Sequence, residues 1–79
     1  MKITLKYFGQ LVDVIGAPEE TQTTSFKDSA QLLKHLKETH AISHIPFQLA
    51  VNQKLIDADE AVSLNEGDVV ALLPPFAGG

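Results

Sequence analysis

The 79-residue sequence contains no cysteine and no arginine. Without cysteine the chain has no disulfides, no thiolate metal site, no cysteine nucleophile and no residue that could hold sulfur as a persulfide. The formal net charge is −4, and together with the lack of arginine this argues against binding to a phosphate backbone, so no nucleic-acid partner is expected. Catalysis by the chain's own side chains is not expected either.

Long hydrophobic runs are also absent. No apolar stretch approaches the ~20 residues that a membrane-spanning helix needs, and the opening residues Lys2-Ile3-Thr4-Leu5 do not resemble a signal peptide. We therefore expect a cytoplasmic protein with no membrane partner. The length, with 44% hydrophobic and 6% aromatic residues, predicts one globular domain with a thin core, which favours a binding module or a subunit.

Hydrophobic periodicity predicts the elements of this domain. Residues 2–8 alternate as a strand, with Ile3, Leu5 and Tyr7 on one face and Phe8 on the other. Asp28 followed by Gln31 is typical of a helix N-cap and predicts the main helix. The predicted elements are strand 2–8, short helix 10–15, edge strand 20–24, main helix 29–39 and strands 47–51, 55–56 and 69–73.

The order β-β-α-β-β-β has strongly apolar first and last strands, which predicts that these two lie side by side at the centre of the sheet. This is an α+β fold of the β-grasp, ubiquitin-like type, in which a mixed sheet of about five strands wraps one main helix. On this prediction the β-grasp domain covers residues 1–73, and residues 74–79 form an extended C-terminal tail.

The tail reads Pro74-Pro75-Phe76-Ala77-Gly78-Gly79. The two prolines end the last strand and favour a stiff, extended backbone. The two glycines have no Cβ, so they can enter a slot too narrow for other residues. Residues 75–79 would reach about 16 Å when extended. We interpret the tail as built for insertion into a partner; a frayed terminus is the alternative.

Four stretches of the chain resemble the MoaD/ThiS family of ubiquitin-like carriers, and in particular its MoaD branch, the small, sulfur-carrying subunit of molybdopterin synthase. The matching stretches are Tyr7-Phe8 with the helix to Gly16, Ala50-Val51-Asn52-Gln53, Glu66-Gly67-Asp68-Val69-Val70-Ala71, and Pro74-Pro75 through Gly78-Gly79.

The resemblance implies a chemistry for the tail. An E1-like adenylating enzyme, using ATP and Mg²⁺, would activate the Gly79 carboxylate, and a sulfur donor protein would convert it to a thiocarboxylate. The sulfur would pass to a cyclic pterin precursor, forming the dithiolene of molybdopterin in an active site on the large subunit. Small and large subunits would form a heterotetramer, two of each, and this chain would be a non-catalytic carrier without a permanently bound cofactor. Its inserted residues would be Pro74, Pro75, Phe76, Ala77 and Gly78.

A docking surface is expected on the outer face of the sheet. If Val70 and Leu72 face the core, the other residues of the last strand face outward. The resemblance implies that apolar positions on this face dock the large subunit, although isolated exposed hydrophobic residues are common on any protein. The predicted docking residues are Phe8, Leu55, Val69, Ala71 and Leu73.

Other functions stay open at this point. His35, His40 and His44 suggest a metal site, but solvated histidines are the preferred interpretation and no metal site is predicted. A carrier for thiazole synthesis or tRNA thiolation would use the same tail with another partner. A ubiquitin-like modifier joined to protein lysines, or an interaction module with an inert tail, are the alternatives from other classes.

Overall fold

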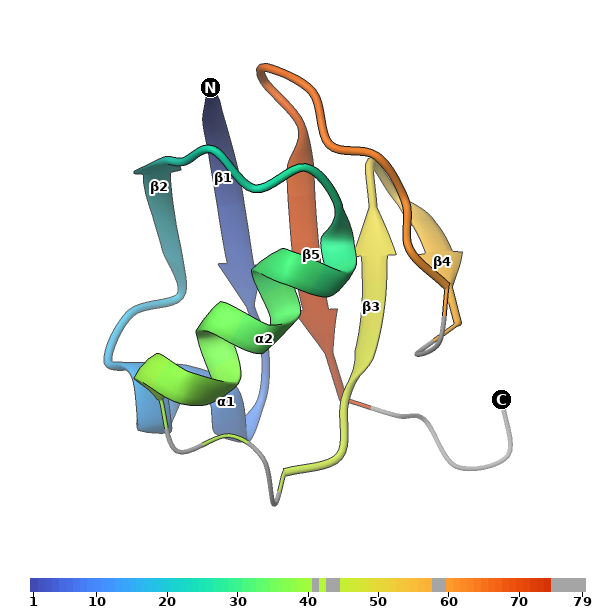
Figure 1. Ribbon diagram of the computed structural model, residues 1–79. Coiled ribbons are helices and arrows are strands. Elements are labelled where there is room, and N and C mark those ends of the chain that lie inside the picture. Colours follow the sequence, from blue (N-terminus) through green and yellow to red (C-terminus); the bar gives the residue numbers. More distant parts are fainter. Residues whose placement is uncertain (41, 43–44, 58–59, 75–79) are drawn as a thin grey trace.

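The computed structural model describes residues 1–40, 42, 45–57 and 60–74. Within them, five strands form one mixed sheet, and the longer helix α2 crosses one face of it (Figure 1). The elements are β1 (Lys2–Tyr7), α1 (Gln10–Ile15), β2 (Glu19–Thr23), α2 (Ser29–Thr39), β3 (Gln48–Val51), β4 (Lys54–Ile56) and β5 (Val69–Leu73).

The sheet has the strand order β2-β1-β5-β3-β4, so the last strand along the chain lies in the middle. β1 and β5 are parallel, with Leu5 opposite Val70, and both β2 and β3 pair antiparallel to their neighbours. A parallel pair of this kind needs a crossover connection, which the intervening chain with α2 supplies. The predicted β-grasp fold, with the first and last strands adjacent, is confirmed.

The core lies between the sheet and α2. Alternate residues of β1 and β5 point toward the helix, and Leu32 and Leu36 of α2 point back at them, which is the pattern of one buried face on each element. The sequence predicts one apolar stripe of Leu32, Leu33 and Leu36 on this helix, but Leu33 is only half-buried because it lies about 100° around the helix from Leu32. The most deeply buried side chains are Ile3, Leu5, Tyr7, Leu11, Leu32, Leu36, Ile42, Val70 and Leu72.

Hydrogen bonds fix the start of α2. Asp28 Oδ1 accepts from the Gln31 amide at 2.9 Å, and Gln31 Oε1 accepts from the Lys27 amide at 2.9 Å, which confirms the predicted cap. The buried Ser29 hydroxyl accepts from the Val62 amide at 2.9 Å, so the connector between β4 and β5 is held against the start of α2. No helix in the described part of the chain is long and apolar enough to cross a membrane.

Strand bounds differ from the prediction by one residue in several places, for physical reasons. Phe47 lies outside β3 because its neighbour Gln48 already pairs with Leu73, the last residue of β5, and Pro74 has no amide with which to extend the ladder. Lys54 belongs to β4 because the β3–β4 turn contains only two residues, so Val51 pairs directly with Lys54.

Candidate functional site

The face of the sheet opposite α2 carries an open groove of about 600 Å³, which we call the outer groove. It runs across β1, β5, β3 and β4, and side chains that alternate with the core residues of those strands form it. The lining residues are Lys6, Phe8, Gln48, Ala50, Asn52, Gln53, Leu55, Val69, Ala71 and Leu73.

The depth of the outer groove follows from one row of paired residues. Lys6 pairs with Ala71, Ala71 with Ala50, and Ala50 with Leu55, so four strands contribute one residue each. With strands about 4.8 Å apart, this row spans roughly 14 Å. The two alanines in the middle form a low floor, and the longer side chains of Lys6 and Leu55 stand at its ends. This shape accepts a protruding apolar side chain of another molecule.

All five residues predicted to dock a partner line the outer groove. Phe8 is 42% exposed and Leu55 is 58% exposed, while the three residues of β5 are half-buried. The sequence prediction assigned neither Lys6 nor Ala50 to the docking surface, although both line the outer groove. The signal for Lys6 was its position two residues before Phe8 in the predicted strand 2–8, since residues two apart on a strand share a face.

The turn between β3 and β4 is locked to the start of β5 at one end of the outer groove. Asn52 and Gln53 have positive φ angles of 51° and 71°, as a two-residue hairpin turn requires. The Asn52 side chain accepts from the Val69 amide at 2.9 Å and donates to Asp68 Oδ1 at 3.0 Å, and its own amide donates to the Val69 carbonyl at 2.8 Å. These three bonds fix the position of Leu55 relative to β5.

The base of the predicted tail lies at the other end of the outer groove. Leu73 pairs with Gln48, and Pro74 follows at once. Gly9, whose φ of 63° and ψ of −137° favour glycine strongly, lies so close that a Cβ on it would stand 3.5 Å from Pro74 Cγ. Gly9 and Pro74 therefore define where the chain leaves the sheet. The other predicted tail residues, Pro75, Phe76, Ala77, Gly78 and Gly79, lie outside the described residues.

On the face of the sheet that packs against α2, a partly buried polar contact ties β1 to β2. The Tyr7 hydroxyl donates to Glu20 Oε1 at 2.6 Å, and the Gln22 side chain donates to the same oxygen at 3.1 Å. Burial raises the pKa of the Tyr7 phenol, and the adjacent Glu20 carboxylate raises it further. This contact joins the strand that ends at the outer groove to its neighbour.

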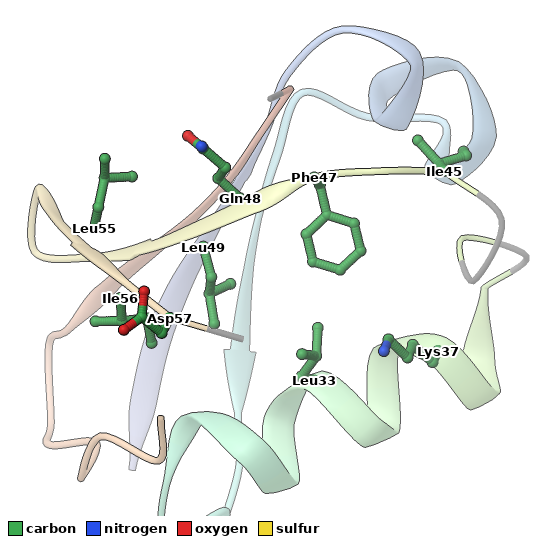
Figure 2. Close-up of a pocket in the computed structure, with 9 residues that line it drawn as sticks. All are labelled: Leu33, Lys37, Ile45, Phe47, Gln48, Leu49, Leu55, Ile56 and Asp57. Carbon is green, nitrogen blue, oxygen red and sulfur yellow. The ribbon is translucent and has the colours of Figure 1, made fainter. Parts of the chain in front are cut away.

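A second cavity of about 460 Å³ lies on the helix side of the sheet, between α2 and β3–β4. Figure 2 shows Leu33 and Lys37 rising from the helix toward Phe47, which points down toward Leu33, with Asp57 at the other end. Sequence reasoning did not identify this cavity.

Metal-ligating side chains do not gather within the described residues, where no three His, Asp or Glu side chains form a group. His35 packs against Phe26 with ring centroids 5.1 Å apart, and His44 lies outside the described residues.

The strand order, the parallel central pair and the longer helix α2 on one face define a β-grasp domain of the ubiquitin-like class. Within that class, the chain belongs to the ThiS family, whose model matches residues 5–79.

Individual relatives agree with this assignment. The chain is 34% identical over 58 residues to the molybdopterin synthase sulfur carrier subunit of Dictyostelium discoideum; the alignment covers 73% of this chain and 66% of that protein, so this chain spans just under two thirds of that relative's length.

Solved structures give the same fold. A chain in the complex of subunits 1 and 2 of the molybdopterin-converting factor from Helicobacter pylori superposes with a TM-score of 0.70 at 28% identity, with 100% of both chains covered. The small archaeal modifier protein 1 from Methanosarcina acetivorans superposes with a TM-score of 0.76 at 22% identity, covering 99% of this chain and 96% of that one. At this identity the second likeness shows the fold alone.

Proposed function

We propose that this chain is the sulfur carrier subunit of molybdopterin synthase, and that it docks on a large subunit through the outer groove. The observation that carries the proposal is the position of the groove: all five residues expected to dock line it, and Pro74 leaves the sheet at its Leu73 end. The Dictyostelium relative and the two-subunit Helicobacter complex support the choice of pathway and of partner.

In this proposal the reacting group is the Gly79 carboxylate. One of its oxygens attacks the α-phosphate of ATP on an adenylating enzyme with Mg²⁺, which releases pyrophosphate and leaves an acyl-adenylate. Sulfide-level sulfur supplied by a sulfur donor protein then attacks the acyl carbon and displaces AMP, so that a carbon–sulfur bond replaces the carbon–oxygen bond to AMP and Gly79 ends as a thiocarboxylate. Within the large subunit its sulfur bonds to a carbon of the cyclic pterin precursor while a carbon–oxygen bond of the precursor breaks, which gives a thioester. Water then hydrolyses the bond between the sulfur and the Gly79 acyl carbon, so the sulfur stays on the pterin and the Gly79 carboxylate is returned. Two carriers deliver the two sulfurs of one dithiolene.

The described domain contributes placement to this chemistry. A groove filled by the large subunit holds the carrier in one orientation, and the Gly9–Pro74 contact sets the point from which the tail starts. From Pro74, residues 75–79 reach about 16 Å in extended form, which is enough to enter a buried site. A stiff Pro74-Pro75 base reduces the conformational entropy that the tail loses when it is ordered.

The test is the intact mass of the chain after incubation with ATP, Mg²⁺, a sulfide source and the cognate adenylating enzyme. We expect a gain that matches one oxygen replaced by one sulfur, and no gain in a variant that lacks Gly79. The thiocarboxylate form should then convert the pterin precursor only when the large subunit is added. No mass gain with an enzyme that is active on another carrier would contradict the proposal.

A second candidate is a ubiquitin-like protein modifier, because the small archaeal modifier protein has the same β-grasp fold and that fold is compatible with either role. It uses the same activated Gly79 but transfers the acyl group to a lysine amine, with loss of AMP. It predicts a ladder of higher-mass conjugates in cells, absent when Gly79 is deleted. If no such ladder forms and the thiocarboxylate form acts on the pterin precursor, the result supports the sulfur carrier and not the modifier.

A further inference from the structure

Lys6 stands out among the residues of the outer groove because it is the one charged side chain of the ten that line it. The sequence has 10 acidic residues against 6 lysines, yet within the described residues no acidic side chain lines this groove. Lys6 occupies one end of the Lys6–Ala71–Ala50–Leu55 row, opposite Leu55. The ammonium charge of Lys6 therefore lies at the β1 edge of the outer groove, whose other lining residues are apolar or carry side-chain amides.

The position of Lys6 has a consequence for any molecule that fills the groove. The alkyl stem of a lysine packs readily on an apolar surface while the ammonium group stays in water. A partner side chain seated over the two alanines removes water from this ammonium group, and a charge that loses water without gaining a partner opposes binding strongly. Glu19, opposite Lys6 on β2, is exposed and lies outside the groove, and exposed pairs of this kind contribute little.

We propose that Lys6 determines the specificity of the outer groove, and that the docking surface of the large subunit presents an Asp or Glu carboxylate beside the apolar side chain that enters the groove. This inference rests on the proposed function and names the chemistry of its partner surface. The carboxylate accepts from the Lys6 ammonium group, and the apolar side chain lies on Ala50 and Ala71 between Lys6 and Leu55. A surface with an apolar projection and no adjacent carboxylate is thereby disfavoured.

The test is the affinity of the cognate large subunit for the whole chain and four variants, measured by titration calorimetry at low and high salt. Lys6→Met keeps an unbranched apolar stem and removes the charge, and Lys6→Glu reverses it. Lys2→Met and Lys2→Glu are matched controls, because Lys2 is an exposed lysine on the same strand and face but outside the groove. We expect about 10-fold weaker binding for Lys6→Met, about 100-fold for Lys6→Glu, and changes within about 2-fold for both controls.

Two further results support the proposal. The wild-type affinity should fall more steeply with salt than that of Lys6→Met, since salt screens the pair. One Asp→Lys or Glu→Lys change on the large subunit should restore the binding of Lys6→Glu.

The inference is overturned if Lys6→Met binds as tightly as the wild type or more tightly, because the groove would then prefer a purely apolar neighbour. In that case the proposed function still stands. If the wild-type chain does not bind the large subunit at all, the proposed function fails and the inference fails with it. The thermal midpoint of each variant, which should stay near that of the wild type because both lysines are exposed, confirms that each is folded.

Discussion

If the outer groove is the docking surface, the contribution of Leu55 to the binding free energy can be calculated from its exposure. Leu55 is the more exposed of the two exposed large apolar side chains in the groove, Leu55 and Phe8. Complete burial of a leucine side chain contributes about 1.5–3 kcal/mol. Leu55 is already partly covered in the free chain, and 58% of it is exposed. Burial of that fraction by a partner contributes about 0.9–1.7 kcal/mol, so Leu55→Ala should weaken binding of the large subunit by about 5- to 20-fold.

The matched control is Val14, on α1. It is 41% exposed, close to the 42% of Phe8, but it does not line the outer groove. Val14→Ala should therefore change the affinity by less than about 2-fold, while Phe8→Ala should weaken it as Leu55→Ala does.

Titration calorimetry on the purified chain and large subunit measures these affinities, and urea unfolding checks the folded state. We expect Leu55→Ala to lower the free energy of unfolding by about 1 kcal/mol, since Leu55 is on an edge strand. Binding by Leu55→Ala within 2-fold of the wild type, or an equal loss in Val14→Ala, would refute the groove as the docking surface.

Three further predictions concern the framework of the site. Tyr7→Phe, which removes the 2.6 Å bond to Glu20, should lower the free energy of unfolding by about 1–2 kcal/mol at neutral pH. The folded state raises the pKa of this phenol, so wild-type stability falls as the pH rises above about 10, and the difference in free energy of unfolding between the wild type and Tyr7→Phe should shrink. Urea unfolding across pH 7–11 measures this difference. A difference that stays constant over this range would contradict the raised pKa of Tyr7. Gly9→Ala forces a side chain into a backbone conformation that costs about 1–3 kcal/mol, so its melting temperature should fall by several degrees in calorimetry, and an unchanged midpoint would refute this. Asp28→Ala should cost about 1 kcal/mol through loss of the α2 cap, as measured by urea unfolding, whereas Asp28→Asn should retain most of the stability.

Much of the fold could be predicted because local patterns and tertiary structure agree. The alternation of polar and apolar residues in β1 predicted which side chains face the core and α2. The same alternation predicted that Phe8 lies on the opposite face of the sheet. The same reasoning on β5 separated Val70 and Leu72 from their outward neighbours. These assignments need only the two-residue period of a strand and one buried face.

The shape of the site could not be predicted in the same way. The floor of the outer groove depends on Ala71 and Ala50 being opposite each other, and this register appears only once β5 lies between β1 and β3. In the run Leu49-Ala50-Val51 all three residues are apolar, so no alternation of polar and apolar residues marks Ala50 as the one that faces outward. The cavity of Figure 2 likewise depends on the angle at which α2 crosses the sheet, which brings Leu33 toward Phe47.

The central position of β5 also constrains how the domain is made. Residue 4 pairs with residue 69, so the contact that joins the two halves of the sheet spans most of the chain. Only the β1–β2 and β3–β4 pairs of the sheet do not involve β5, and β5 is the strand that joins these two pairs. Folding is therefore delayed until the strand that leads into the tail has left the ribosome. Truncated chains that lack this strand should fail to fold, so quality control can remove them before they compete for a partner.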